Sequence, residues 1–188
     1  PFLPRPAVRW NGEEFYLDDD RPQSVGRMRS FYGNFGNLVR AYTYIRSLGL
    51  EGLRDVSALA VLNANYMRMT FKELGFEIPF DRINMHEFVA QPPAGLRTLD
   101  IAKALLDYGV HPMTVYFPLS VKEAMMVEPT ETESLETIDG FAEILGEILE
   151  KAAADPQWIK SAPYETPVRR LDEVKAARQP ILKYDFPD

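Results

Sequence analysis

Apolar residues recur at helical spacing in two neighbouring stretches near the start of the chain. Between residues 34 and 48 they follow one another three or four positions apart, and Gly49 then interrupts the pattern. A second such stretch covers residues 53–74 and stops at Gly75. Because only residues 49–52 separate the two stretches, we predict two long helices that pack against each other in antiparallel fashion.

Short apolar segments in the middle of the chain predict strands. These segments are residues 76–80, 85–90, 113–119 and 124–127. Helical spacing returns at residues 98–109, with Thr98 as the expected N-cap, and at residues 131–153. Short strands between long helices predict an α/β (α+β) fold, in which a small, mostly antiparallel sheet packs against the helices.

Both ends of the chain are rich in proline and in polar residues. We predict that residues 1–28 form an extended arm with one hairpin at Asn11-Gly12, since this dipeptide accepts a positive φ. Asp155-Pro156 is expected to end the last long helix. The remaining tail is predicted to be mostly irregular, with a short helix over residues 172–178.

Charge and cysteine content exclude several classes of protein. The 188 residues carry a net charge of −7, which argues against nucleic-acid binding because that function needs a basic surface. With no cysteine and two histidines, the chain has neither disulfides nor cysteine-based zinc sites. No apolar run approaches the roughly 20 residues of a membrane-spanning helix, so we expect a cytoplasmic protein that binds neither membranes nor a metal. The chain begins with Pro1 in place of methionine, and we therefore expect it to be cut from a longer protein.

The two histidines and an acidic turn are the residues most suited to a binding site. His86 begins an apolar segment, and His111 lies at a bend between a predicted helix and a predicted strand, where functional residues often occur. Either histidine could equally have an ordinary hydrogen-bonded role. Residues 128–134, Glu-Pro-Thr-Glu-Thr-Glu-Ser, place Thr130 three positions before Glu133, which is the spacing of a capping box. This turn either caps the following helix or contacts a ligand or partner.

Residues 30–36, Ser-Phe-Tyr-Gly-Asn-Phe-Gly, precede the first predicted helix. Free backbone N–H groups at a helix N-terminus can hold a phosphate, although the spacing differs from that of nucleotide-binding glycine loops. The stretch therefore either simply begins the helix or presents donors to a phosphate.

Eight short blocks follow one another along the chain in a recognisable order. They are Pro1-Phe-Leu-Pro4, Asp20-Arg-Pro-Gln-Ser-Val-Gly-Arg27, Phe31-Tyr-Gly-Asn-Phe-Gly36, Leu62-Asn-Ala-Asn-Tyr66, Met85-His-Glu-Phe88, Asp100-Ile-Ala-Lys103, Asp107-Tyr-Gly109 and Met126-Val-Glu-Pro-Thr-Glu-Thr-Glu-Ser134. In this order the blocks resemble the C-terminal part of subunit 2 of the decarboxylating glycine dehydrogenases, the P-proteins of the glycine cleavage system.

The resemblance implies a fold-type I enzyme that depends on pyridoxal phosphate. Residues 1–33 would then be an extended arm and the end of the large domain, and residues 34–188 the C-terminal small domain. The implied activity is that of an oxidoreductase of glycine catabolism, which decarboxylates glycine and passes the aminomethyl group to the lipoyl H-protein. The implied partners are the N-terminal portion of the same subunit, subunit 1 and the H-protein. The alternative is a non-catalytic α/β module that only mediates subunit interaction.

In the family, the lysine that binds the cofactor follows a histidine upstream of the Pro-Phe-Leu-Pro block. Lys72, Lys103 and Lys122 are not preceded by histidine. We therefore expect pyridoxal phosphate in the full-length enzyme, no bound cofactor and no catalytic residue in this fragment, and no activity of the fragment alone.

The resemblance also implies positions for two groups of binding residues. Tyr32, Gly33 and Asn34 would lie near the cofactor phosphate or near a neighbouring subunit's site. The small domain would help to hold the substrate, and its candidate residues are His86, Arg97, His111, Glu128, Thr130 and Glu131. The glycine carboxylate suits the planar fork of an arginine, and Arg97, Arg29 or a residue outside the chain could supply it.

Overall fold

The computed structural model describes residues 1–28 and 33–184, and these form two compact units. Unit 1 is Pro1–Glu51 and unit 2 is Gly52–Asp188. One long helix, α1 (Phe35–Glu73), begins in unit 1 and ends in unit 2. The domain boundary expected after residue 33 stays a prediction. In the described part of the chain, no helix is both long and apolar enough to span a membrane.

Unit 1 contains the predicted hairpin. Strands β1 (Ala7–Trp10) and β2 (Phe15–Asp18) pair in antiparallel register, with Trp10 opposite Phe15. The Oδ1 atom of Asn11 accepts hydrogen bonds from the backbone N–H groups of Glu13 and Glu14, each at 2.9 Å. Gly12 completes the turn with a φ of 106°. The prediction of a hairpin at Asn11-Gly12 is therefore confirmed.

Helix α1 contains both of the helical stretches that the sequence predicts. Gly49 interrupts it with φ 65° and ψ −171°, a conformation that is essentially confined to glycine. The helical character of both stretches is thus confirmed. The two stretches belong mainly to different units, so their antiparallel packing stays a prediction.

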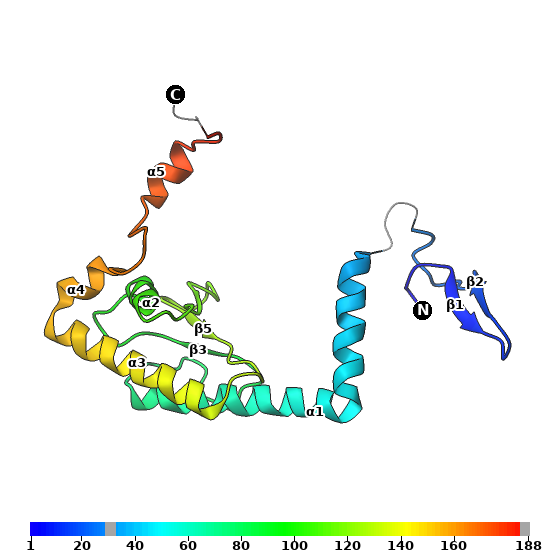
Figure 1. Ribbon diagram of the computed structural model, residues 1–188, viewed down its shortest axis with the longest axis horizontal. Coiled ribbons are helices and arrows are strands. Elements are labelled where there is room, and N and C mark those ends of the chain that lie inside the picture. Colours follow the sequence, from blue (N-terminus) through cyan, green and yellow to red (C-terminus); the bar gives the residue numbers. More distant parts are fainter. Residues whose placement is uncertain (29–32, 185–188) are drawn as a thin grey trace. The chain divides into compact units, whose positions relative to one another are not determined.

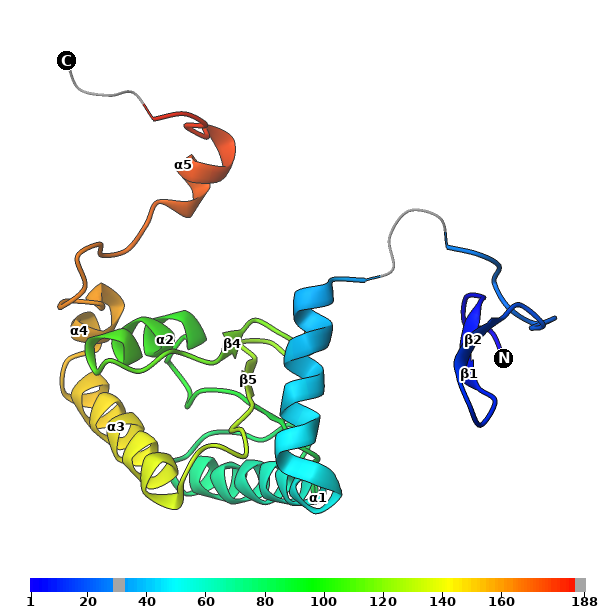
Figure 2. The same cartoon turned by 45° about the vertical axis from the view of Figure 1, so that its right-hand side comes forward.

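Unit 2 contains a small sheet with helices around it (Figures 1 and 2). Its three strands lie in the order β3-β5-β4 and every pairing is antiparallel. In chain order the elements after α1 are β3 (Phe88–Ala90), α2 (Thr98–Asp107), β4 (Thr114–Val115), β5 (Met125–Val127), α3 (Leu135–Ala154), α4 (Pro156–Ser161) and α5 (Glu173–Arg178).

The core of unit 2 lies where these elements meet. All but one of the largest fully buried apolar side chains come from α1, β3, β5, α2, α3 and α4. They are Phe71, Phe88, Met125, Ile101, Leu105, Ile138, Leu145, Ile148 and Ile159, and the remaining one is Pro163, which follows α4. The ring of Phe71 lies 4.7 Å from that of Phe76, 5.2 Å from that of Phe88 and 6.3 Å from that of Phe141. This aromatic cluster joins α1, β3 and α3.

Several predicted boundaries are wrong for local reasons. The segment 76–80 forms one bridge, Glu77 to Gln91, in place of a strand. Helix α3 begins at Leu135 because the hydroxyl of Ser134 accepts a hydrogen bond from the N–H of Thr137. Thr130 and Glu133 therefore form a turn before the helix, and the predicted capping box is wrong. Thr98 is the first residue of α2 and not its N-cap.

The predictions for the C-terminal part of the chain are confirmed in part. Asp155-Pro156 ends α3 as predicted, but the pair also begins α4, which the sequence analysis missed. Asp155 accepts from the N–H of Gln157, and proline suits the first position of a helix. The short helix expected near residues 172–178 is α5, capped by Asp172.

Asp81 forms an ion-pair cluster with two residues of α1, and this cluster predicts how the stability of the chain changes at acidic pH. Asp81 accepts hydrogen bonds from Lys72 and from the buried Arg68, and the Lys72 bond is the main reason why the pKa of Asp81 lies below its ordinary value of 3.8. A lowered folded-state pKa contributes stability that is present above the unfolded-state pKa and is lost as the pH falls through the folded-state pKa.

We therefore expect the free energy of unfolding of the native chain to fall more steeply below about pH 4 than that of Asp81→Asn. Urea titrations at several pH values between neutral and strongly acidic would measure this. Asp20→Asn, at an exposed carboxylate in unit 1, is the matched control and should keep the native pH slope. Equal slopes for the native chain and Asp81→Asn would contradict the prediction.

Candidate functional site

Two asparagines on α1 fix two loops of unit 2. The side-chain N–H₂ group of Asn63 donates to the backbone oxygens of Thr130 at 2.9 Å and Glu133 at 3.1 Å. The amide of Asn65 donates to the oxygen of Asn84 at 2.7 Å and accepts from its N–H at 3.0 Å. The turn after β5 and the loop before β3 are therefore both held to the same helix.

The pairing of β3 with β5 brings charged residues together beside these loops. Phe88 lies opposite Val127 at one end of the pairing, and Glu87 and Glu128 are the residues that flank this pair in the chain. One ligand atom each from His86, Glu87 and Glu128 lie within 4.8 Å of one another. His86 and Glu128 are exposed and Glu87 is half-buried.

Next to this cluster is a cavity of about 510 Å³. Its lining comes from α1, the segment before β4 and the first residue of β4, the end of β5, the turn after β5 and the start of α3. The lining residues with polar side chains are His111, Thr114, Glu128, Thr130, Glu133 and Thr137; the apolar ones include Met67, Met113, Met126, Ile138 and Phe141. The cavity thus has an apolar wall and a polar, acidic rim.

The structure brings together four of the six predicted substrate-binding residues. His111, Glu128 and Thr130 line the cavity, and His86 lies beside Glu128. Glu131 lies in the same turn but does not line the cavity. The substrate-binding role of all six residues stays a prediction.

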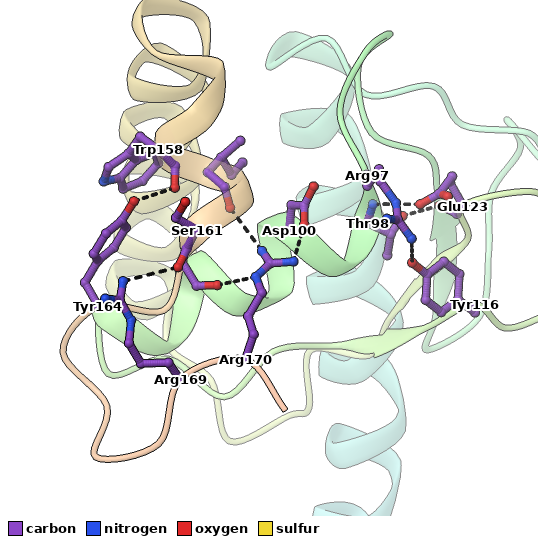
Figure 3. A network of polar contacts seen from close by, with 12 residues as sticks. Arg97, Thr98, Asp100, Tyr116, Glu123, Trp158, Ser161, Tyr164, Arg169 and Arg170 are labelled. Atoms are coloured by element: carbon purple, nitrogen blue, oxygen red, sulfur yellow. Dashed lines mark hydrogen bonds and ion pairs between the residues drawn. The ribbon is translucent and has the colours of Figure 1, made fainter. Parts of the chain in front are cut away.

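Arg97 lies in a different polar network, at the start of α2 (Figure 3). Its Nη2 atom donates to the hydroxyl of Tyr116 at 3.4 Å, and this bond is the main reason why the pKa of Arg97 is raised. Nearby, the carboxylate of Glu123 accepts from the N–H of Thr98 at 2.8 Å, and the Thr98 hydroxyl donates to the backbone oxygen of Glu123. Glu123 therefore satisfies a free donor at the N-terminus of α2, and Arg97 does not line the cavity.

Two of the predicted cofactor-binding residues, Gly33 and Asn34, lie in unit 1. Tyr32 is outside the described residues. Gly33 has a φ of 114°, and the side-chain oxygen of Asn34 accepts from the N–H of Asn37 at 3.3 Å at the start of α1. Asn34 thus caps the helix, which supports the simpler of the two interpretations of this stretch; its contact with a phosphate stays a prediction.

The sequence pattern did not predict that the two asparagines hold these loops. The signal was present in the block Leu62-Asn-Ala-Asn-Tyr66, because asparagine is a poor helix former and two of them occur in the middle of a long helix. The third polar residue of the block, Tyr66, donates to Asp139 on α3 at 2.7 Å, and this bond raises the pKa of Tyr66.

This cavity does not by itself fit pyridoxal phosphate. No lysine or arginine of the described chain lines the cavity, and the carboxylates of Glu128 and Glu133 would repel a phosphate. Of the three lysines considered above, Lys72 is paired with Asp81. The cavity therefore offers neither an amine for the cofactor aldehyde nor cationic donors for its phosphate.

Solved structures of similar fold include two enzymes. A crystal structure of an inhibitor-bound glycine decarboxylase (P-protein) of the glycine cleavage system matches 76% of this chain and 34% of that chain, with a TM-score of 0.58 and 20% identity. An aspartate aminotransferase from Thermus thermophilus matches 61% of this chain and 33% of that chain, with a TM-score of 0.51 and 20% identity. These matches confirm the predicted fold class, an α/β domain with a small antiparallel sheet packed by helices.

Sequence relatives extend the match to nearly the whole chain. A probable glycine dehydrogenase (decarboxylating) subunit 2 from Thermus thermophilus is 61% identical over 184 residues, which is 98% of this chain and 38% of that protein. The chain thus spans about two fifths of the length of the curated relatives that it matches. Residues 56–162 match the family described as "Glycine dehydrogenase, C-terminal domain". The 188-residue chain therefore belongs to the C-terminal domain family of the glycine dehydrogenases, as the resemblance predicted.

Proposed function

We propose that the chain acts as the C-terminal portion of a pyridoxal-phosphate-dependent glycine decarboxylase of the glycine cleavage system. The observation that carries this proposal is the 61% identity over 98% of the chain to a protein named as subunit 2 of that enzyme. The match in fold to a glycine decarboxylase structure supports it independently. The activity belongs to the assembled enzyme, and the isolated chain is inactive.

The proposal assigns the cofactor to residues outside this chain. When bound, pyridoxal phosphate supplies the electron sink for loss of carbon dioxide. The N-terminal portion of the same subunit provides the lysine, glycine dehydrogenase subunit 1 completes the enzyme, and the lipoyl H-protein accepts the aminomethyl group. The assembly works in the cytoplasm.

Within this chain, we assign a role in substrate binding to the cavity of the small domain. Its support is that His111, Glu128 and Thr130 line it and that His86 lies beside Glu128, so that three separate segments of the chain meet there. Asn63 acts as a positioning residue, because its hydrogen bonds to the backbone of Thr130 and Glu133 hold the turn that carries Glu128. Arg97 remains one of the possible partners of the glycine carboxylate.

A labelling experiment tests the assignment of the cofactor. The full-length subunit and the 188-residue chain would each be mixed with pyridoxal phosphate, reduced with borohydride and mapped by mass spectrometry. We expect one specific modified lysine in the full-length subunit and none in the 188-residue chain. Specific modification of Lys72, Lys103 or Lys122 would overturn the assignment. Release of labelled carbon dioxide from carboxyl-labelled glycine, measured on the same two samples, reports the activity itself.

A non-catalytic module for subunit interaction is the second candidate. Exposed apolar side chains on unit 1 favour it, among them Val8, Phe15 and Leu17 of the hairpin and Phe35 and Tyr42 of α1. The variant His111→Ala in the assembled enzyme separates the two functions, since His111 is exposed and lines the cavity. Loss of turnover with unchanged subunit association supports the enzyme portion, whereas unchanged turnover supports the module.

A further inference from the structure

The loop that carries His86 gains little from apolar packing. This loop, residues 81–87, leads into β3, and His86 lies near its end. Its two large apolar side chains lie in solvent, since Ile83 is 85% exposed and Met85 is 71% exposed. An apolar side chain stabilises a position mainly by leaving water, so these two contribute little. Polar contacts must therefore hold the loop in place.

The side chain of Asn65 binds the backbone of this loop at two points. Its amide N–H₂ group donates to the backbone oxygen of Asn84 at 2.7 Å, and its oxygen accepts from the backbone N–H of the same residue at 3.0 Å. The amide nitrogen also donates to the backbone oxygen of Val61 at 2.8 Å, within α1. An asparagine amide offers two N–H donors and one acceptor oxygen. Each of these groups has a partner here, so the orientation of the Asn65 side chain is fixed.

The same face of α1 also holds the first residue of the loop. Asp81 accepts hydrogen bonds from Arg68 and Lys72. Residues 65, 68 and 72 are three and four positions apart, which places them on one side of a helix. The loop is thus bound to α1 at Asp81 and again at Asn84. The second contact lies two residues before His86 and is the nearer of the two in the chain.

Asn63 holds the neighbouring segment from the other side of the helix. Two positions in an α-helix differ by about 200° around its axis, so Asn63 and Asn65 point in nearly opposite directions. Asn63 binds the turn after β5, which contains Glu128. Glu128 lines the cavity, and one of its carboxylate oxygens lies within 4.8 Å of an imidazole nitrogen of His86. The two asparagines therefore fix the two segments that place His86 next to the cavity lining.

We propose that Asn65 is a positioning residue of the substrate site, because its two hydrogen bonds to Asn84 keep His86 beside Glu128. The inference rests on the proposed function and deepens it, since Asn65 does not itself line the cavity. Asn65 acts on the place of His86 and touches no reacting group. Its loss therefore weakens the binding of glycine and leaves the chemical step nearly unchanged, which is the kinetic pattern of a raised KM at constant kcat.

Hydrogen exchange in the 188-residue chain tests whether Asn65 holds the loop. We expect amide exchange in residues 81–87, measured by mass spectrometry, to become about tenfold faster in Asn65→Ala, the effect of one lost hydrogen bond. Asn84→Ala is the matched control, because it keeps both backbone groups of residue 84 and removes only a side-chain bond to the oxygen of Arg82. It should exchange at the native rate. Native exchange in Asn65→Ala would overturn the proposal.

Steady-state kinetics of the assembled enzyme test what the loop does for the substrate. Release of labelled carbon dioxide from carboxyl-labelled glycine would be measured with the full-length subunit, subunit 1 and the H-protein. We expect Asn65→Ala to raise the KM for glycine about tenfold and to change kcat less than threefold, whereas Asn84→Ala keeps both values. Slow amide exchange in α3 shows that the variant is folded. If Asn65→Ala does not fold, Asn65→Asp replaces it, because it has nearly the same shape and lacks only the two donors.

A double-mutant cycle shows whether Asn65 acts through His86. If it does, the KM of the double variant Asn65→Ala/His86→Ala should lie within about twofold of that of His86→Ala, because the second change has nothing left to displace. Multiplied effects, or an unchanged KM in Asn65→Ala, would overturn the inference. A native assembled enzyme that releases no carbon dioxide from glycine would instead overturn the proposed function, so the two failures are distinguishable.

Discussion

Replacing Phe71 by alanine is expected to lower the free energy of unfolding of unit 2 by about 4 kcal/mol, the size typical of a buried Phe→Ala change. The Phe71 side chain has no exposed surface and contacts the rings of Phe76, Phe88 and Phe141. Removing the ring would leave a hole at the junction of α1, β3 and α3, which the surrounding backbone cannot fill. Urea unfolding followed by circular dichroism measures the loss.

The same helix offers a control for this change. Phe35 lies on α1 in unit 1 and has 78% of its surface exposed, so Phe35→Ala should change the stability by no more than about 0.5 kcal/mol. A loss below about 1 kcal/mol in Phe71→Ala would show that the aromatic cluster does not form the core described here.

The second large effect is expected at Arg170, which anchors the tail to the core (Figure 3). Its guanidinium pairs with Asp100 at 2.7 Å and donates to the backbone oxygens of Ala162 at 2.7 Å and Ile159 at 3.1 Å. Asp100 is on α2 and has only 5% of its side chain exposed. Arg170→Ala would leave this carboxylate unpaired in the interior together with two carbonyl groups at the end of α4, so we expect a loss of about 3 kcal/mol.

Two variants show whether the loss comes from this network. Arg169 is the neighbouring arginine, and it donates to Pro163 and Ser161 and stacks on Tyr164 at the surface. Arg169→Ala should cost less than about 1 kcal/mol. Arg170→Lys keeps the charge without the planar fork and should give an intermediate value. If both alanine variants unfold at the same urea concentration, Asp100 does not depend on Arg170.

Most of the helices of this fold were predictable because each has a continuous local signal. The apolar spacing along the second half of α1 and along α3 indicates which face is buried. Asn11-Gly12 fixes the hairpin locally, through the side chain of Asn11 and the positive φ of Gly12. The start of α3 was harder, since Thr130 and Ser134 carry equally good capping hydroxyls. Ser134 is the cap that forms, while the backbone oxygen of Thr130 accepts from Asn63, a contact that joins residues 67 positions apart.

The candidate site was predictable in its residue types but not in its geometry. His86, His111 and Glu128 were predicted because they are rare or clustered polar residues, and the structure places His111 and Glu128 in the lining of one cavity and His86 beside Glu128. Arg97 was grouped with them on chemical grounds, yet its partner is Tyr116 in another network. The separation follows from the register of β3 on β5 and from the start of α2, and neither is encoded in local sequence.

Gly49 determines where the regular helical geometry of α1 is interrupted. A residue with a Cβ atom at position 49 would meet no neighbouring atom, so the constraint is purely one of backbone stereochemistry. Gly49→Ala would therefore favour an uninterrupted helix over the present bend, without any steric clash to relieve. The backbone stereochemistry of L-amino acids therefore sets the position of this bend, which lies two residues before the end of unit 1.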